Sequence, residues 1–390
     1  NAEIVSGTIS NFQDAVDYLT WTFFFRRIAQ NPSYYGIQDS SLEGLTEYLS
    51  TLVEKVVQDL QDSGCVIVKT NRDDTTSIIP TRLGDISSYY YLNYKSAHAF
   101  ETSFQQLGSE ISMKDLLGLL CKAEEFSELP VRHNEDILNM QLEEHLPWKA
   151  FLKDYESPHV KSFLLLQAHF SHVNLPISDY ITDLKSVLDQ TLRVCQAFID
   201  VAAEKKNLHA ILSMIHILQM IMQGRWMSDS PLLLLPHVNE KSVQKLNRMD
   251  IFALPQLMHM SDGDLHNTLK SALFHTKHVE DAKRIIEKLP RVSLQLEYKN
   301  NLVKASLQRT GHPSRKAYLP NYPKPKDESW FLVVSLKNEV KALKRVHLSQ
   351  FNTFVSLNMN QKGVYPGDEL TVHLFSDSYI GLDQEHQLKL

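Results

Sequence analysis

The spacing of apolar residues predicts helices through most of the first eighty residues. Helical spacing around "QDAVDYLTWTFFFRRIAQNPSYYG", Gln13 to Gly36, gives two apolar stripes, formed by Phe12, Val16, Leu19 and Phe23 and by Tyr18, Trp21, Phe25 and Ile28. Two stripes predict one helix that is buried on two sides, with aromatic side chains that pack and do not stack on bases. Trp21→Ala is therefore expected to destabilise the protein by roughly 3–5 kcal/mol.

A second amphipathic helix is predicted from about Leu42 to Leu60, and a change of period follows it. The segments "CVIVKT" and "TSIIP" flank the polar turn "NRDD" and are typical of two short paired strands. Helix, helix and β-wing together predict the latter part of a winged-helix fold over residues 1–81.

Helical periods dominate again from residue 82 to about residue 230, where Gly and Pro are sparse. The clearest predicted helices are Leu116–Leu120, Ser162–His172, Ile181–Ala203 and Leu208–Gln223. This region is predicted to be a helical bundle. Residues 231–290 then predict three short helices with tight turns and a longer helix to about Leu289, a helix-loop-helix unit similar to a helix-hairpin-helix.

Past Pro290 the pattern changes to alternation of apolar and polar residues. The predicted strands are "VSLQLEY", "LVKASLQRT", "WFLVVSL", "VKALKRVHL", "TFVSLNM" and "ELTVHLFSD". Residues 291–390 are most simply an antiparallel β-sandwich. The whole chain is therefore predicted to be multidomain and mainly α, with a C-terminal all-β domain.

Composition narrows the classes of function. A chain of 390 residues with a net charge of -6 and a pI near 6.3 is not basic throughout, so any nucleic-acid contact is confined to particular surfaces. Its three cysteines form no CxxC pair, which argues against a disulfide framework and a zinc site and favours a reducing compartment. No segment is apolar enough to span a membrane and no signal peptide begins the chain. We expect a soluble intracellular fragment of a longer protein, without membrane contact.

The sequence lacks the common catalytic motifs. GxxxxGK[ST], GxSxG, HExxH and an EF-hand loop do not occur. The cluster "RHNED", formed by Arg132, His133, Asn134, Glu135 and Asp136, could place an imidazole and a carboxylate on one helix face, as a catalytic or metal site requires. A polar helix start that satisfies backbone ends and neighbouring helices is the favoured interpretation. We predict no catalytic residue and no metal ligand.

Two further candidates lie on predicted helices. His169 and His172 in "LLLQAHFSH" are one turn apart but supply too few ligands for a closed zinc site, so a buried, hydrogen-bonded histidine is expected. Gln190 and Arg193 lie three residues apart on the more polar face of Ile181–Ala203. A guanidinium both pairs with phosphate and stacks on rings, but from spacing alone a solvated face is the simpler interpretation.

One local basic run extends from Lys299 to Lys326 and has no acidic residue between its ends. It contains "HPSRKAYLPNYPKP", which is typical of an exposed loop within the sandwich. A solvated or partner-binding loop and an RNA-contacting loop both remain open. The candidate basic surface consists of Lys304, Arg309, Arg315, Lys316 and Lys324.

Several segments carry a family resemblance that covers essentially the whole chain in order. They are "NAEIVSGTISNFQDAVDYLTWTFFFRRIAQNPSYYG", "SSYYYLNY", "LPVRHNED", "SPHVKSFLLLQAHFS", "VLDQTLRVCQAFIDVAA", "IMQGRW" and "FSDSYIGLDQEH". Together they resemble the C-terminal unit of tandem-cassette superfamily 2 RNA/DNA helicases, called the Sec sixty-three homology domain. The chain could belong to either of two branches of this family. One contains the helicase subunit of the activating signal cointegrator 1 complex and its yeast ribosome-quality-control relative, and the other contains the spliceosomal U-five helicase. "FFFRRIAQNPSYYG" and "LPVRHNED" resemble the first branch more.

The resemblance implies a winged helix, a seven-helix bundle, a helix-loop-helix unit and a fibronectin-like or immunoglobulin-like sandwich. It also implies that the motor domains, which bind ATP and Mg²⁺, are absent here, and that this fragment holds no cofactor. Residues 181–203 would be the ratchet helix that crosses a single strand, with Gln190 and Arg193 at its strand-facing positions. Arg193→Ala is then expected to weaken strand coupling with little loss of stability.

The function that this resemblance implies is a non-catalytic module that guides single-stranded RNA or DNA and docks regulatory partners. The expected partners are the upstream motor domains and other subunits of a cointegrator or ribosome-rescue complex, in the nucleus and cytoplasm. The implied pathways are DNA-alkylation repair with transcription coactivation, or ribosome-associated quality control. The alternative is a pure protein interaction platform of a regulatory helicase cassette, as in spliceosome activation.

Overall fold

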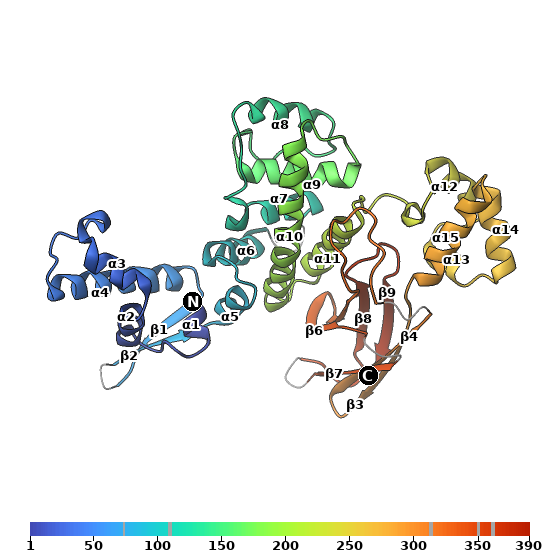
Figure 1. Cartoon of the computed structure of the whole chain (residues 1–390). Helices are drawn as coiled ribbons and strands as arrows, with labels where there is room; N and C mark the ends of the chain where they lie inside the picture. The colour runs from blue at the N-terminus through green and yellow to red at the C-terminus, as the bar shows by residue number, and fades with distance from the viewer. Residues whose placement is uncertain (73–74, 108–110, 312–314, 349–351, 360–362) are drawn as a thin grey trace.

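Four groups of elements follow one another along the chain. The computed structural model describes residues 1–72, 75–107, 111–311, 315–348, 352–359 and 363–390. In Figure 1 the winged helix lies at one side and the helix-loop-helix unit at the other, and the helical bundle and the β-sandwich lie between them. The predicted fold class, mainly α with a C-terminal β domain, is confirmed.

The N-terminal group has the second amphipathic helix and the two-stranded wing that the pattern predicts. Two residues of the "NRDD" turn, 73 and 74, lie outside the described residues. Strands β1 and β2 pair antiparallel, with Val66 opposite Pro80. The elements are α1 Ala2–Val5, α2 Phe12–Thr20, α3 Phe23–Gln30, the 3₁₀ helix η1 Pro32–Tyr35, α4 Leu42–Asp62, β1 Val66–Thr70 and β2 Thr76–Pro80.

The single aromatic helix predicted near the N-terminus is wrong. The chain leaves helical geometry at Thr22, whose backbone is extended and whose side chain caps α3 by accepting a hydrogen bond from the amide of Phe25. Because the helix restarts there, the two apolar stripes do not continue through it. Trp21 is 90% exposed and Phe23 is 72% exposed. Trp21 is therefore not a buried strut, and the expected stability cost of its removal does not hold.

The helical bundle consists of seven α-helices in the described part of residues 82–223. Helix α10 lies at its centre and packs against α5, α6, α7, α9 and α11. Residues Val160–Phe170 of α9 are all buried, as expected for the core helix that the Leu164–Leu166 run predicts. The elements are α5 Arg82–Tyr89, α6 Tyr94–Leu107, α7 Met113–Cys121, the 3₁₀ helix η2 Glu124–Phe126, α8 Glu135–Glu144, α9 Pro158–Ser171, α10 Ser178–Glu204 and α11 Leu208–Gln223.

The helix-loop-helix unit follows a short 3₁₀ helix. Its first three helices are short and its last is longer, as the sequence pattern predicts. The elements are η3 Pro231–Leu234, α12 Glu240–Asn247, α13 Leu254–Met258, α14 Asp262–Ala272 and α15 Thr276–Lys288.

The C-terminal group is a sandwich of two antiparallel sheets. One sheet has the strand order β3-β4-β7 and the other has the order β6-β5-β8-β9. The six predicted strands are present, and β9 is an additional edge strand that the sequence pattern did not predict. The strands are β3 Arg291–Lys299, β4 Leu302–Thr310, β5 Trp330–Leu336, β6 Glu339–Val346, β7 Asn352–Asn358, β8 Glu369–Ser376 and β9 Gln384–Lys389.

Hydrophobic packing crosses the predicted domain boundaries near residues 81, 230 and 290. Phe331 and Val333 of β5 and Phe375 of β8 pack in the same cluster as the bundle helices. The helix-loop-helix unit shares a second cluster with residues of both sheets of the sandwich, including Trp330 and Leu332 on the other face of β5. Alternate residues of β5 therefore fill both clusters, because successive side chains of a strand point to opposite faces.

Candidate nucleic-acid interface

One polar face of α10 is open along the N-terminal half of the helix. Lys185 and Gln190 are exposed and Arg193 is half-buried on this face, whereas Val187 and Leu188 point into the core. The spacing of these polar residues places them within one broad arc of an α-helix. We call Lys185, Gln190 and Arg193 the polar face of α10.

Gln190 and Arg193 contact each other, as their three-residue spacing predicts. Nη2 of Arg193 donates to Oε1 of Gln190 at 2.6 Å. Nη1 of Arg193 also donates to the carbonyl oxygens of Tyr90, at 2.8 Å, and of Tyr91. The guanidinium therefore joins α10 to the turn after α5, a structural role that the sequence did not predict.

A second arginine fixes the same turn from the sandwich. Nη2 of Arg345 in β6 donates to Oδ1 of Asp200 at 2.8 Å, and its Nη1 donates to the hydroxyl of Tyr90. The Tyr90 hydroxyl donates to Oδ2 of Asp200 at 2.7 Å. Burial raises the pKa of Tyr90, so its hydroxyl keeps its proton at neutral pH. The turn after α5 is therefore held from both α10 and β6.

The loop between β4 and β5 brings a lysine to the polar face of α10. Nζ of Lys324 lies 2.6 Å from Oδ2 of Asp189, the residue before Gln190, and the Lys324 side chain is 64% exposed. Nδ2 of Asn321 donates to the carbonyl oxygen of Gln223 at 2.8 Å, and Tyr322 is buried. This part of the loop packs on the bundle, which corrects the expectation of a loop exposed within the sandwich. Residues 312–314 of that loop lie outside the described residues.

The remaining members of the predicted basic surface do not form one surface. Arg309 is only 7% exposed, and its Nε lies 2.5 Å from Oε1 of Glu328, so Arg309 is wrong as a surface residue. Burial raises the pKa of Glu328, although the hydrogen bond from Arg309 opposes this shift. Lys304 lies exposed on β4 opposite Glu297 of β3, and Arg315 and Lys316 are exposed in the loop. Only Lys324 is placed beside Gln190 and Arg193.

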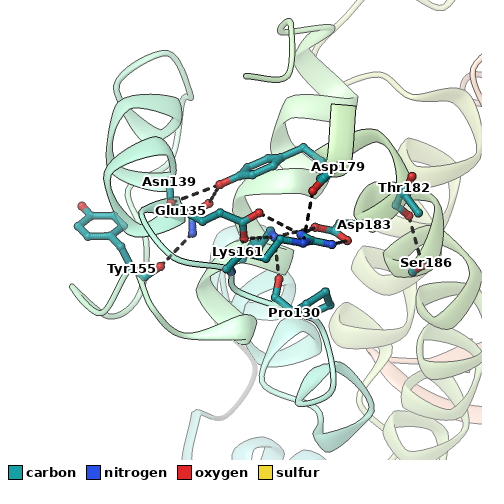
Figure 2. Close-up of polar contacts among 11 residues, drawn as sticks. Pro130, Glu135, Asn139, Tyr155, Lys161, Asp179, Thr182, Asp183 and Ser186 are labelled. Atoms are coloured by element: carbon teal, nitrogen blue, oxygen red, sulfur yellow. Dashed lines mark hydrogen bonds and ion pairs between the residues drawn. The ribbon is translucent and has the colours of Figure 1, made fainter. Parts of the chain in front are cut away.

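The "RHNED" segment forms part of a buried ion cluster (Figure 2). Nζ of Lys161 lies 2.6 Å from Oε2 of Glu135 and 2.7 Å from Oδ2 of Asp183, and the Lys161 side chain is fully buried. Nη1 of Arg132 reaches the same two carboxylates at 2.9 Å and 2.7 Å. Asp179 lies 3.4 Å from Nε of Arg132 at the rim. The cluster joins α8, α9 and α10.

The charges in this cluster compensate one another. Burial alone would raise the pKa of Glu135 and of Asp183. Hydrogen bonds from Lys161 and Arg132 together outweigh this effect, so the pKa of each carboxyl group is lower than its ordinary value. Hydrogen bonds to Asp183 and Glu135 raise the pKa of Arg132. The carboxylates are therefore ionised and paired at neutral pH.

Three members of "RHNED" lie outside this buried pairing. His133 and Asn134 are exposed, and Asp136 is half-buried at the start of α8. Asn134 adopts a left-handed backbone with φ of 65° immediately before the helix. Sequence analysis missed Lys161 and Asp183, although a lone lysine in the apolar run "VKSFLLL" indicates a buried cation that needs partners.

Of the two histidine candidates, His169 is buried and hydrogen-bonded as the sequence predicts, whereas His172 is not buried. His169 is 8% exposed, and its Nε2 lies 2.9 Å from the carbonyl oxygen of Ile221. Burial lowers its pKa to about 4, so the ring is neutral at physiological pH. His172 is exposed, beyond the end of α9. Among the described residues, no group of three or more histidine, cysteine or acidic side chains is arranged to hold a metal ion.

Two further features bear on the composition. Cys65, Cys121 and Cys195 are buried free thiols, and burial raises the pKa of each. Within the described residues, none of the helices has the length and apolar character needed to cross a lipid bilayer.

The order of winged helix, seven-helix bundle, helix-loop-helix unit and sandwich defines a helicase-associated module. Residues 80–389 match the family model of the Sec63 Brl domain, and residues 1–70 match that of a Winged Helix-turn-helix domain. The chain belongs to the Sec63 Brl domain family.

The curated relatives are subunits of larger assemblies or helicases. The chain is 36% identical to activating signal cointegrator 1 complex subunit 3 of Homo sapiens, across all of this chain and 20% of that protein. It is 38% identical to the DExH-box ATP-dependent RNA helicase DExH14 of Arabidopsis thaliana and 32% identical to the U5 small nuclear ribonucleoprotein 200 kDa helicase of Mus musculus, in each case across all of this chain and 18% of the relative.

These relatives confirm the family resemblance and the non-catalytic character of the segment. The chain spans about a fifth of the length of the relatives it matches. Its residues correspond to the Sec63 Brl and winged-helix regions, so the helicase motor domains are not among them.

Proposed function

We propose that this chain guides single-stranded nucleic acid, RNA in the first place, along the polar face of α10 beside a helicase motor. The observation that carries the proposal is the placement of Lys324, from the loop between β4 and β5, against Asp189 of α10, next to the bonded pair Gln190 and Arg193. Arginine and lysine pair with phosphates, and glutamine and arginine can contact bases. Membership of a family whose relatives include an RNA helicase supports RNA as the first choice.

The charges at this face support weak, guiding contact rather than tight binding. Asp189 partly neutralises Lys324, and Arg193 already bonds to Gln190 and to the turn after α5. A strand that moves past the module must be released at each step, so few phosphate contacts and a small salt dependence suit guidance. The overall charge of -6 is compatible with such a confined contact.

The wider cellular role belongs to the same proposal. One relative is a subunit of the activating signal cointegrator 1 complex. On the family resemblance, the module would act with upstream motor domains and other complex subunits in the nucleus and cytoplasm, in DNA-alkylation repair with transcription coactivation or in ribosome-associated quality control. ATP and Mg²⁺ would be bound by the motor domains and not by this module.

A second function, docking of protein partners, is supported by a separate observation. Four large apolar side chains of the winged helix are strongly exposed: Trp21 is 90% exposed, Phe23 72%, Tyr34 73% and Leu42 75%. Trp21 directly follows α2, and Phe23, Tyr34 and Leu42 lie on α3, η1 and α4, in the winged helix and not in the bundle that contains α10. Where exposed apolar side chains form a contiguous patch, that patch is typical of an interaction surface. If the module only docks partners, these residues matter and Gln190 does not.

The deciding experiment measures the affinity of the 390-residue chain for a labelled single-stranded RNA across a salt series. Gln190→Ala and Lys324→Ala are compared with Lys270→Ala, which changes an exposed lysine of α14. We expect weak binding of the wild type, and its affinity should fall as salt is added. Gln190→Ala and Lys324→Ala should each lower the affinity severalfold. Lys324→Ala should also reduce the dependence of the affinity on salt concentration, because it removes a cation that pairs with phosphate. Binding that none of the variants alters, or no binding at low salt, would contradict strand guidance and favour protein docking.

A further inference from the structure

The segment "SSYYYLNY" holds two exposed aromatic rings on the turn whose backbone Arg193 of α10 contacts. Tyr89 is 77% exposed and Tyr91 is 84% exposed, whereas Tyr90 between them is only 6% exposed. The Tyr90 hydroxyl is held by Asp200 and Arg345. The middle tyrosine therefore anchors the segment in the protein, and the outer two present their rings to solvent.

The backbone of Tyr91 is held in an unusual conformation. Its φ is 49°, in the left-handed region that bulky residues rarely adopt. The amide of Leu92 donates to the carbonyl oxygen of Ser87 at 2.8 Å, and the hydroxyl of Ser87 donates to the carbonyl oxygen of Leu92 at 2.8 Å. Arg193 bonds to the Tyr91 carbonyl oxygen. These hydrogen bonds hold the left-handed backbone of Tyr91, whose ring is exposed. Backbone strain of this kind is found at functional sites more often than elsewhere.

The neighbours of these rings favour one kind of ligand. Leu92 is buried, and the next exposed side chains along the chain are Asn93 and Lys95. Polar side chains thus follow the rings along the chain, and the guanidinium of Arg193 lies 2.8 Å from the carbonyl oxygen of Tyr90 in the same turn. Aromatic faces next to cationic groups are the combination that binds unpaired bases of a single strand.

We propose that Tyr89 and Tyr91 form a base-stacking platform for a single strand that follows the polar face of α10. This inference rests on the proposed function and adds residues to it: Arg193 would position the turn and the platform would hold the bases. Since every base has a flat aromatic face, the platform would accept unpaired RNA or DNA with little sequence preference and would exclude paired bases in a duplex.

The test uses a single-stranded RNA with one 2-aminopurine, whose fluorescence falls when it stacks on an aromatic ring. Tyr91→Asn removes the ring but keeps a residue that tolerates the left-handed backbone, and Tyr91→Phe keeps the ring. Tyr365→Ala serves as the matched control, because Tyr365 is a 68% exposed tyrosine of the sandwich. All variants are measured in the 390-residue chain.

We expect the wild type, Tyr91→Phe and Tyr365→Ala to bind alike and to quench the fluorophore in at least one position along the RNA. Tyr91→Asn should lose this quenching and bind roughly 5- to 150-fold more weakly, with an unchanged salt slope because no phosphate contact is removed. Binding that depends on Gln190 and Lys324 but is the same in Tyr91→Asn would overturn the platform alone. A wild type that does not bind single strands would overturn the platform and the proposed function together.

Discussion

Nη1 of Arg193 lies 2.8 Å from the carbonyl oxygen of Tyr90, so a side chain on the polar face of α10 also holds the turn after α5. The expectation that Arg193→Ala leaves stability almost unchanged does not fit this contact. Its loss leaves the carbonyl oxygens of Tyr90 and Tyr91 without a charged donor. Gln190 is exposed and its side-chain oxygen accepts from Arg193 rather than holding the turn, so it is the cleaner position for testing strand binding.

We predict that Arg193→Ala lowers the free energy of unfolding by about 1.5–3 kcal/mol, the usual range for hydrogen bonds to charged groups. Lys185→Ala, on the same face of the same helix, should change it by less than about 0.5 kcal/mol. Chemical denaturation of both variants measures the difference. Equal stability of the two variants would show that the contact with the turn contributes nothing.

Removal of the buried lysine should destabilise the bundle strongly. Lys161→Met leaves Glu135 and Asp183 buried with only Arg132 to compensate them, and breaking a buried pair in this way costs about 3–5 kcal/mol. Lys149→Met is the matched control, because Lys149 is 63% exposed and lies 3.8 Å from its partner Glu143. It should cost less than about 1 kcal/mol. Similar denaturation midpoints for the two variants would contradict the structural role of the cluster.

The helix break at Thr22 reverses the expectation for Trp21. Trp21→Ala removes a 90% exposed ring and should change the free energy of unfolding by less than about 1 kcal/mol. Ile28→Ala in the next helix removes a fully buried side chain that packs with Ile37, Leu45 and Leu49, and should cost about 2–5 kcal/mol. Thermal unfolding of both variants tests this order. A larger loss for Trp21→Ala would mean that its ring is buried after all.

Asp383 should make stability depend on pH at the contact between bundle and sandwich. Burial raises its pKa to about 7, although hydrogen bonds from Gln219 and the Ser376 amide oppose the shift. The unfolded chain releases this proton near pH 3.8 and the folded chain only near pH 7, so this group lowers stability as pH rises between the two values. His216 faces it at 4.0 Å, and burial lowers the pKa of that histidine.

Asp383→Asn removes this titration and should be more stable than the wild type at pH 8, on the order of 2 kcal/mol after allowance for partial exposure. At pH 4 the two proteins should differ little, because Asp383 is then protonated in the folded protein. Urea denaturation at the two pH values provides the comparison. A stability difference that does not change with pH would exclude the raised pKa.

The change of hydrophobic period was enough to predict most elements, since helices of the bundle and strands of the sandwich bury one regular face. The pattern failed to predict two features: a helix boundary set by one polar side chain and a strand made mainly of polar residues. The hydroxyl of Thr22 caps a new helix inside an apolar run. Strand β9, with the sequence "QEHQLK", is half-buried on one side and exposed on the other and carries mainly polar residues, so its pattern does not distinguish it from a loop.

The candidate site was only partly predictable for the same reason. The contact of Gln190 with Arg193 follows from helical spacing, but the partners of Arg193 and Lys324 come from residues about a hundred positions or more away. Arg309 and Lys324 belong to one basic run, and only the fold separates the buried Arg309 from the exposed Lys324. Charge runs show where cations occur but not which of them reach the surface.

The most direct test of strand guidance is photocrosslinking from the helix itself. A photoreactive amino acid is placed at Gln190 in one protein and at Lys270 in another, each is irradiated with labelled single-stranded RNA, and the crosslinked yield is compared. We predict a crosslink from position 190 that unlabelled single strands compete away, and none above background from position 270. Equal yields from the two positions, or none from position 190, would contradict the guidance of a strand by α10.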